Sequence, residues 1–348
     1  MPQEENHKRR VHYSGKYPRN FKEKYKELNP EKYSDTVEHV RKKGSTPAGM
    51  HISIMVREIL DILKIRPGET GFDATLGYGG HTKAMLECLG EQGHMYATDV
   101  DPIESEKTRK RLAAAGFGED ILTIKLQNFC TIDEIAREAG GFDFILADLG
   151  VSSMQIDDPD RGFSYKNDGP LDLRLNPEAG ISAAQRLDSI SAEELAGMLV
   201  ENSDEPYAEK LALAITGKIR RGHRIDTTRK LYEVIAEALD FLPEKEKKDT
   251  VKKTCQRVFQ ALRIDVNNEF EVLYEFLEKL PGALKPGGRV AILTFHSGED
   301  KLVKRAFKEG LRDGVYADAA RDVIRPSAEE CAQNGRARST KLRWAVRA

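Results

Sequence analysis

Glycine and aspartate residues that could bind a nucleoside cofactor occur together in DATLGYGGHT, residues 73–82, where a strand is expected to end. Gly77, Gly79 and Gly80 would let the backbone approach a ligand closely, and the helix expected next would offer free N–H groups. Asp99 ends the next expected strand, twenty residues after Gly79. A carboxylate at this spacing lies near the ribose hydroxyls of an adenosine-containing ligand when both strand ends open onto one crevice. The pattern predicts a nucleoside cofactor, with a tight turn that binds nothing as the alternative.

Acidic residues end three of the expected strands: Asp73, Asp99 and Asp148. Carboxylates favour the sulfonium and amino groups of S-adenosyl-L-methionine. NAD suits the same kind of crevice, so an NAD-dependent dehydrogenase is an alternative. Each Asp also has a simpler explanation as the cap of a helix or turn. Capping explains any one of these residues well, but it is a weaker explanation for three acids at successive strand ends.

A long polar segment, residues 147–174, follows the fourth expected strand. It has neither a helical nor a strand periodicity, and it is much longer than an ordinary connection, which is typical of a functional loop. We expect Gln155 to lie at the rim of the crevice. Arg161 has two interpretations, an internal ion pair with Asp157 or Asp158 and a contact to a phosphate group.

The sequence LTFHSGED places His296 at the end of a fifth expected strand. His296 could accept a proton there or serve as a hydrogen-bonded structural histidine. Ser297 and Asp300 have the spacing of a capping box for the next helix. The basic run RARSTKLR, residues 336–343, could contact phosphates or form a solvated edge strand.

Alternating strand and helix patterns must position these residues, and they predict a parallel, doubly wound α/β sheet in residues 48–175 and 281–348. Residues 181–280 contain only helical patterns. We therefore expect an all-helical insertion in residues 176–280, which we interpret as an RNA-recognition domain. Residues 1–47 are polar and basic, as expected of an N-terminal extension.

Composition excludes several classes of protein. The chain has 348 residues and a net charge of −2, and no apolar stretch approaches a membrane span or a signal sequence. Its four cysteines form neither a CxxC pair nor a metal-ligand cluster, which favours a reducing cytoplasm. Twelve basic and seven acidic residues in positions 1–50, and five basic residues without an acid in the last fourteen, suit a polyanionic partner such as RNA.

Several segments together resemble the bacterial small-subunit ribosomal RNA cytosine-N4 methyltransferases of the MraW/RsmH type. They are DATLGYGGHT, DFILADLGVSSMQIDDPDRGFSYKNDGPLDLRL, RVFQALRIDVNNEFEVL, ILTFHSGEDKLVKRAFK and PSAEECAQNGRARSTKLR. The resemblance implies a class I, Rossmann-like methyltransferase that uses S-adenosyl-L-methionine, and a cytosine in the decoding centre of 16S rRNA in the small ribosomal subunit as its target. The cofactor contacts that it implies are Gly79, Gly80, His81, Asp99, Phe129, Asp148 and Gln155.

Departures from the family pattern occur at Ser53, at Lys253–Cys255, at Gly298 and at Gly335. They leave the expected cofactor residues intact but make the methylated nucleotide less certain, so the chain could be a divergent paralogue. The alternatives are a methyltransferase of this fold that acts on another rRNA base or on DNA, and a non-catalytic RNA-binding assembly factor. The sequence also leaves open whether the protein is a homodimer.

A methyltransferase for the weakly nucleophilic N4 amine of cytosine needs an acceptor for the N4 proton, and Asp148 and Asp172 are the candidate catalytic residues. A base inside a helix must also leave its stack to reach such a pocket. The expected phosphate-binding surface comprises the basic extension, the basic tail and, in the insertion, Arg220, Arg221, His223 and Arg224.

Overall fold

The computed structural model describes residues 53–348, which form one unit, Ser53–Ala348. The expected N-terminal extension, residues 1–47, and the first residues of the expected α/β domain lie outside the described residues.

The strands are β1 (Thr70–Asp73), β2 (His94–Asp99), β3 (Leu122–Leu126), β4 (Phe142–Asp148), β5 (Leu284–Thr294), β6 (Tyr316–Ala319) and β7 (Lys341–Arg347). The helices before the insertion are α3 (Val56–Leu63), α4 (Gly80–Leu89), α5 (Pro102–Ala114), α6 (Ile132–Ala139) and α7 (Ser153–Asp157). The later helices are α8 (Ala183–Ser189), α9 (Ala192–Ser203), α10 (Ala208–Arg220), α11 (Thr228–Ala238), α12 (Glu244–Asn267), α13 (Glu269–Ala283), α14 (Ser297–Arg312) and α15 (Ala328–Gln333). None of the helices in the described part of the chain is long and apolar enough to cross a membrane.

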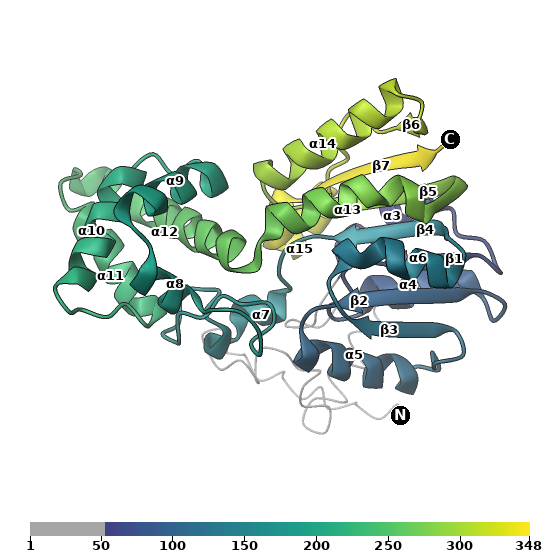
Figure 1. Cartoon of the computed structure of the whole chain (residues 1–348), viewed down its shortest axis with the longest axis horizontal. Coiled ribbons are helices and arrows are strands. Elements are labelled where there is room, and N and C mark those ends of the chain that lie inside the picture. The colour runs from purple at the N-terminus through teal and green to yellow at the C-terminus, as the bar shows by residue number, and fades with distance from the viewer. Residues whose placement is uncertain (1–52) are drawn as a thin grey trace, which may run out of the picture. The chain divides into compact units, whose positions relative to one another are not determined.

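One seven-stranded sheet carries the α/β part, in the order β3-β2-β1-β4-β5-β7-β6 (Figure 1). Strands β1 to β5 are parallel, and β7 runs antiparallel to both of its neighbours. This is the class I methyltransferase variant of the Rossmann-like fold, which confirms the predicted fold class. Because the strand order reverses between β1 and β4, ligands are expected at the carboxyl ends of these strands.

Alternation along β4 explains why both faces of the sheet are covered. Phe144 and Leu146 pack with α3, α4 and α5 on one face, whereas Ile145 and Ala147 pack with α6, α13 and α14 on the other. All four side chains are fully buried. A strand that is buried on both faces has a continuous apolar run, as in the sequence FDFILAD.

Helices α8 to α12 form a separate hydrophobic cluster of their own. Helix α13, which the sequence pattern assigns to the insertion, instead buries Leu273 and Phe276 in the cluster on the sheet. The packing therefore changes near Asn267, where α12 ends, and not near residue 280. A helical periodicity alone gives no indication of which partner a helix packs against. The division into domains, and an RNA-recognition role for the insertion, stay proposals.

The C-terminal strand is not the solvated edge strand that was one interpretation of residues 336–343. β7 lies between β5 and β6, so it is not an edge strand, and Arg343 within it is only 5% exposed. The edge strand on this side of the sheet is β6, a four-residue strand that the sequence patterns did not predict.

Candidate active site

The three predicted acids stand at the carboxyl ends of neighbouring strands. β2 ends at Asp99, β1 at Asp73 and β4 at Asp148, and these strands are adjacent in the sheet. The structure therefore brings them to one edge, at the point where the strand order reverses. Their environments differ, and these differences determine what each carboxylate can do.

The glycine loop between β1 and α4 needs glycine for steric reasons. Gly79 is the N-cap of α4 with a φ of 79°, and a Cβ there would lie 2.6 Å from Thr108 Cγ2. Gly80 begins the helix, and its Cβ would overlap the Ser53 hydroxyl. The loop is thus closely packed from behind, and its N–H groups lie at a helix N-terminus that suits anionic or polar ligand groups.

Asp73 has a structural explanation. Its side chain is 0% exposed and accepts hydrogen bonds from Thr82 Oγ1, at 2.6 Å, and from the Thr75 N–H, at 3.0 Å. Burial raises the pKa of Asp73, and the Thr82 hydrogen bond offsets only part of this effect. Asp73 therefore fastens the first turn of α4 to the end of β1.

Asp99 holds the glycine loop through backbone contacts. One carboxylate oxygen accepts from the Gly77 N–H at 2.8 Å, and the other accepts from the Asp101 N–H at 2.9 Å. Burial raises the pKa of Asp99 to about 6, although both N–H groups favour the ionised form. Each carboxylate oxygen can accept a second hydrogen bond, so Asp99 can also accept from a pair of ribose hydroxyls.

Asp148 lies beside His81. The two side chains approach to 3.4 Å between His81 Nδ1 and Asp148 Oδ2, while His81 Nε2 is 2.8 Å from the Ile54 carbonyl oxygen. A carboxylate and a carbonyl oxygen on the two ring nitrogens favour the imidazolium, in which both nitrogens carry a proton. Burial opposes this charge, but Asp148 and Ile54 outweigh it and raise the pKa of His81.

The second carboxylate oxygen of Asp148, Oδ1, is buried and has no hydrogen-bond partner among the described residues. A buried acceptor without a partner costs free energy, and such groups are concentrated where a ligand completes the site. The Asp148 N–H donates to Thr75 Oγ1 at 2.7 Å, which fixes the end of β4 against the glycine loop.

Gln155 and Arg161 both bind Asp101, a residue that the sequence patterns did not predict. Gln155 Nε2 lies 3.0 Å from Asp101 Oδ2, and Arg161 Nη1 lies 2.7 Å from the same oxygen. Arg161 also donates to the backbone carbonyls of Arg174 and Leu175. The expected pairing of Arg161 with Asp157 or Asp158 is therefore wrong, because a partner sixty residues earlier in the chain is folded against it.

A local signal for Asp101 exists in the sequence. Asp101 directly precedes Pro102, the first residue of α5, and it accepts from the Ile103 and Glu104 N–H groups as an N-cap. An Asp before an N-terminal Pro is a recognisable cap pattern. No local pattern reveals its second role as the anchor for Arg161.

Phe129 begins a short 3₁₀ helix after β3, Phe129–Thr131, and packs edge-on against Phe276 at 5.2 Å between ring centroids. It is partly buried beside the sheet cluster. It is therefore held in place by the core while part of its ring stays exposed, as a wall for a planar ligand requires.

Asp172, the second candidate proton acceptor, has both carboxylate oxygens engaged. Arg174 binds it through Nε and Nη2, each at 2.7 Å, and the Arg174 N–H donates to it at 3.1 Å. Its neighbours Leu171 and Leu173 are buried in the helical cluster. A catalytic role for Asp172 stays a prediction, and it would require Arg174 to release the carboxylate.

His296 caps α14, and its reciprocal partner is Glu299. The expected capping box of Ser297 and Asp300 is therefore wrong by one position, because the helix begins one residue earlier than that pattern requires. Asp300 instead binds Arg343, at 2.7 Å. The His296 ring lies 5.7 Å from the ring of Phe270, and a Cβ at Gly298 would lie 2.5 Å from the Phe270 ring.

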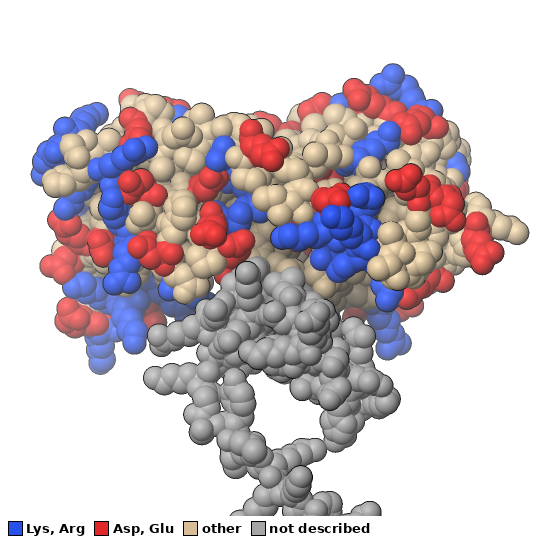
Figure 2. All heavy atoms as spheres, turned by 90° about the horizontal axis from the view of Figure 1, so that it is seen from below, with Lys and Arg blue, Asp and Glu red and all other residues tan. Residues whose placement is uncertain are grey.

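The basic run of the tail is largely used within the protein. Arg336 pairs with Asp157, and Arg343 and Lys341 pair with Asp300. All four insertion residues predicted to contact phosphate are exposed: Arg220, Arg221, His223 and Arg224. Arg224 also lies 3.7 Å from Asp188, and Arg221 donates to the Gly217 carbonyl oxygen. On the face seen in Figure 2, basic and acidic side chains are interspersed.

These groups fit S-adenosyl-L-methionine. The glycine loop ends at the N-terminus of α4, Asp99 retains acceptor capacity for ribose, and Asp148 has an oxygen without a partner among the described residues. Such a donor set suits a cationic, adenosine-containing molecule.

Comparison with known proteins identifies the family. A model of the MraW methylase family matches residues 48–348. Ribosomal RNA small subunit methyltransferase H 1 of Agathobacter rectalis is 79% identical over 348 residues, which is 100% of both chains. The protein of the same name from Lachnoclostridium phytofermentans is 68% identical over 99% of this chain and 94% of its own. Ribosomal RNA small subunit methyltransferase H of Thioalkalivibrio sulfidiphilus is 39% identical, over 86% of this chain and 98% of its own.

The match over 100% of this chain includes residues 1–47, so the Agathobacter rectalis protein shares the N-terminal extension. The family match covers 301 of 348 residues, which is most of the chain. The chain therefore belongs to the MraW methylase family, and it is a methyltransferase whose methyl donor is S-adenosyl-L-methionine.

Proposed function

We propose that this protein methylates the exocyclic N4 amine of a cytosine in the decoding centre of 16S rRNA. The relatives named above are small-subunit rRNA methyltransferases, and the family membership decides against an NAD-dependent dehydrogenase. The observation that carries the proposal is Asp148 at the end of β4, beside His81, with one buried oxygen that lacks a partner in the described part of the chain.

The chemistry of cytosine makes this arrangement useful. The N4 lone pair is delocalised into the ring, so the amine is a poor nucleophile. A carboxylate that accepts a hydrogen bond from N4–H increases electron density on the nitrogen, and it can take the proton as positive charge develops. In this proposal Asp148 Oδ1 is the acceptor, and the His81 imidazolium holds the other oxygen in a fixed orientation.

When bound, S-adenosyl-L-methionine supplies an electrophilic methyl group. In our proposal the glycine loop, through Gly79 and Gly80, borders the cofactor, and Asp99 accepts from the ribose hydroxyls. Phe129 borders the adenine, and Gln155 connects the segment after β4 to Asp101. Fixed positions for both reactants lower the entropic part of the barrier.

A direct experiment tests the proposal. Small subunits from a strain that lacks this protein are incubated with the purified protein and S-adenosyl-L-methionine, and fragments of 16S rRNA are analysed by mass spectrometry. We expect one new methyl group on N4 of a decoding-centre cytosine. A methyl group on another base, or none with active cofactor binding, would refute the assignment.

One observation favours a second candidate, the same chemistry on a different base. Gly298 is one of the departures from the family pattern, and Phe270 occupies the space that a side chain there would need. The surface near His296 therefore differs in shape from the pattern of the family. The same mass-spectrometric map distinguishes the two targets, because it reports the position of the methyl group.

A further inference from the structure

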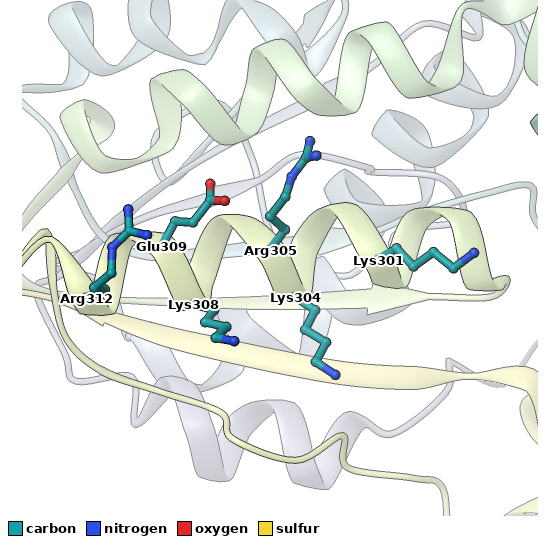
Figure 3. Close-up of a pocket in the computed structure, with 6 residues that line it drawn as sticks. All are labelled: Lys301, Lys304, Arg305, Lys308, Glu309 and Arg312. Carbon is teal, nitrogen blue, oxygen red and sulfur yellow. The ribbon is translucent and has the colours of Figure 1, made fainter.

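Helix α14 presents a basic face that the proposed chemistry does not use. Lys301, Lys304, Arg305 and Lys308 are exposed along it, and with Glu309 and Arg312 they line a surface hollow of about 460 Å³ (Figure 3). Val303 and Phe307 of the same helix are buried against the sheet, Leu302 and Ala306 are partly buried beside them, and Leu311 near the end of the helix is exposed. The helix thus has one face that packs in the core and one that consists mainly of cations.

These cations lack the partners that other helical bases have. Lys301, Lys304, Arg305 and Lys308 make no hydrogen bond or ion pair with any residue that the structure describes. On α5, by comparison, Lys107 pairs with Glu104 at 2.8 Å and Lys110 with Glu106 at 3.1 Å, each within one turn.

The acids at the start of α14 face inward. Glu299 is 3% exposed and accepts from the Phe295 N–H, and Asp300 binds Arg343. Like charges four residues apart destabilise a helix, as in the pairs Lys301 with Arg305 and Lys304 with Lys308. The basic face therefore carries a cost in the free protein that a polyanion would relieve.

The position of α14 links this face to the active site. Leu293 of β5 pairs with Asp148 of β4, and α14 begins four residues later, at Ser297. From Lys301 to Lys308 the helix rises roughly 10 Å at about 1.5 Å per residue. That length matches on the order of three phosphates at the 3.4 Å axial spacing of one nucleic-acid strand.

We propose that this face of α14 binds the phosphate backbone of the rRNA next to the target base. The inference rests on the proposed function and adds a contact surface outside the insertion. A membrane surface suits the helix less well, because an interfacial helix exposes an apolar face and α14 buries its own. Charge complementarity with a polyanion is what these side chains offer.

Paired substitutions test the proposal. Lys304→Gln together with Lys308→Gln removes two charges and leaves polar side chains that are one atom shorter. The control is Arg109→Gln with Lys110→Gln on α5, outside the insertion, where both side chains are exposed and both pair with Glu106. Affinity for 16S rRNA is measured by filter binding between 50 and 300 mM salt, and affinity for S-adenosyl-L-methionine is measured by calorimetry.

We expect the α14 variant to bind 16S rRNA about tenfold more weakly at physiological salt. The slope of log affinity against log salt should fall by about 1.4 to 1.8, the value for two lost phosphate contacts. The cofactor affinity of the α14 variant and the RNA affinity of the α5 control should match those of the unmodified protein. An unchanged slope, or an equal loss in the α5 control, would overturn the assignment.

Two further outcomes also refute it: loss of binding to phosphatidylglycerol vesicles, or to an acidic protein, with RNA binding unchanged. The proposed function is tested separately, by the position of the methyl group in the rRNA. If methylation maps to the expected cytosine while the α14 variant binds RNA normally, the surface is refuted and the function stands. If the variant loses RNA affinity but the methyl group lies elsewhere, the surface stands and the function is refuted.

Discussion

The glycine loop and the segment after β4 border the same strand ends, but they are held in different ways. The glycine loop, residues 74–79, is fixed over short distances, largely through backbone N–H groups that donate to Asp73 and Asp99. The segment after β4, residues 149–175, is fixed by side-chain ion pairs with distant partners, Arg161 with Asp101 and Arg336 with Asp157. Backbone contacts survive most substitutions, whereas a buried ion pair fails when either partner is lost.

This difference has a consequence for function. We infer that the cofactor side is preorganised by the fold itself, since its contacts form as soon as β1, β2 and α4 do. The segment after β4 is ordered only when its charged contacts form, so its position should be more sensitive to mutation and pH. Substitutions in the glycine loop and in the segment after β4 can test whether activity and stability depend on the two regions in different ways.

The largest effect is expected at the junction of the two regions. Asp148→Asn keeps the shape of the side chain but removes the proton acceptor beside His81. We expect methyl transfer to small subunits to fall by a factor on the order of 10² to 10⁴, the range for loss of a general base. Radiolabelled methyl incorporation measures the rate at saturating cofactor, and calorimetry measures separately any loss of affinity for S-adenosyl-L-methionine, because Asp148 is also an expected cofactor contact.

Asp172→Asn is the matched control, because Arg174 already occupies that carboxylate. We expect a loss of less than tenfold. An equal or greater loss than for Asp148→Asn would transfer the role of proton acceptor to Asp172.

Breaking the buried ion pair should give the next largest effect. Arg161→Met leaves Asp101 buried, at 0% exposure, without its charged partner. We expect the free energy of unfolding to fall by about 3–5 kcal/mol, measured by urea denaturation. Methyl transfer should also decrease, because residues 149–175 lose their anchor.

Arg174→Met is the comparison on the same segment. Its pair with Asp172 is partly exposed, so the loss of stability should be no more than about 1 kcal/mol. Similar losses for the two arginines would show that burial of the pair with Asp101 is not what orders the segment.

A smaller effect is expected within the glycine loop. Gly79→Ala forces an L-residue into the left-handed region, at about 1–2 kcal/mol, and its Cβ meets Thr108. Affinity for S-adenosyl-L-methionine should fall by about tenfold. Gly116→Ala is the control, because Gly116 also has a positive φ but open space around it, so stability should fall without loss of cofactor affinity.

The smallest expected effect is the titration of Asp99. Burial raises its pKa to about 6, so between pH 4 and 6 the folded protein binds more protons than the unfolded chain. Ionisation of Asp99 therefore lowers stability as pH rises through about 6. Asp99→Asn removes this effect, and the melting temperature of the variant relative to the original protein should increase by a few degrees from pH 5 to pH 7. A difference independent of pH would place the titration elsewhere.

Much of the cofactor side could be predicted because its signals are local. The glycines, the Asp at the end of each strand and the alternation of strand with helix lie within short windows, and each has one common structural explanation. The predicted strand ends at Asp73, Asp99 and Asp148 are confirmed. The sequence does not distinguish a cofactor contact by Asp73 from the hydrogen bond that Asp73 accepts from Thr82, because both need an Asp at the end of the strand.

The contacts of Arg161 and of the basic tail could not be predicted in this way, because they join segments that are far apart in the sequence. The sequence pattern offered Arg161 two nearby acids, and it binds neither, because the fold brings Asp101 within 2.7 Å. The basic tail suggested a phosphate surface, but β7 lies inside the sheet, where Arg343 meets Asp300. The sequence patterns give α14 no role in binding, but the structure leaves the basic side chains of this helix exposed.

By itself, the sequence of this protein determined most of its secondary-structure elements, its fold class and its family, because hydrophobic periodicity and glycine positions act over a few residues. Only the tertiary structure decided which charges neutralise one another and which stay available to a ligand. The reason is physical: the energy of a charge depends on burial and on the nearest opposite charge, and both are set by folding and not by position in the chain.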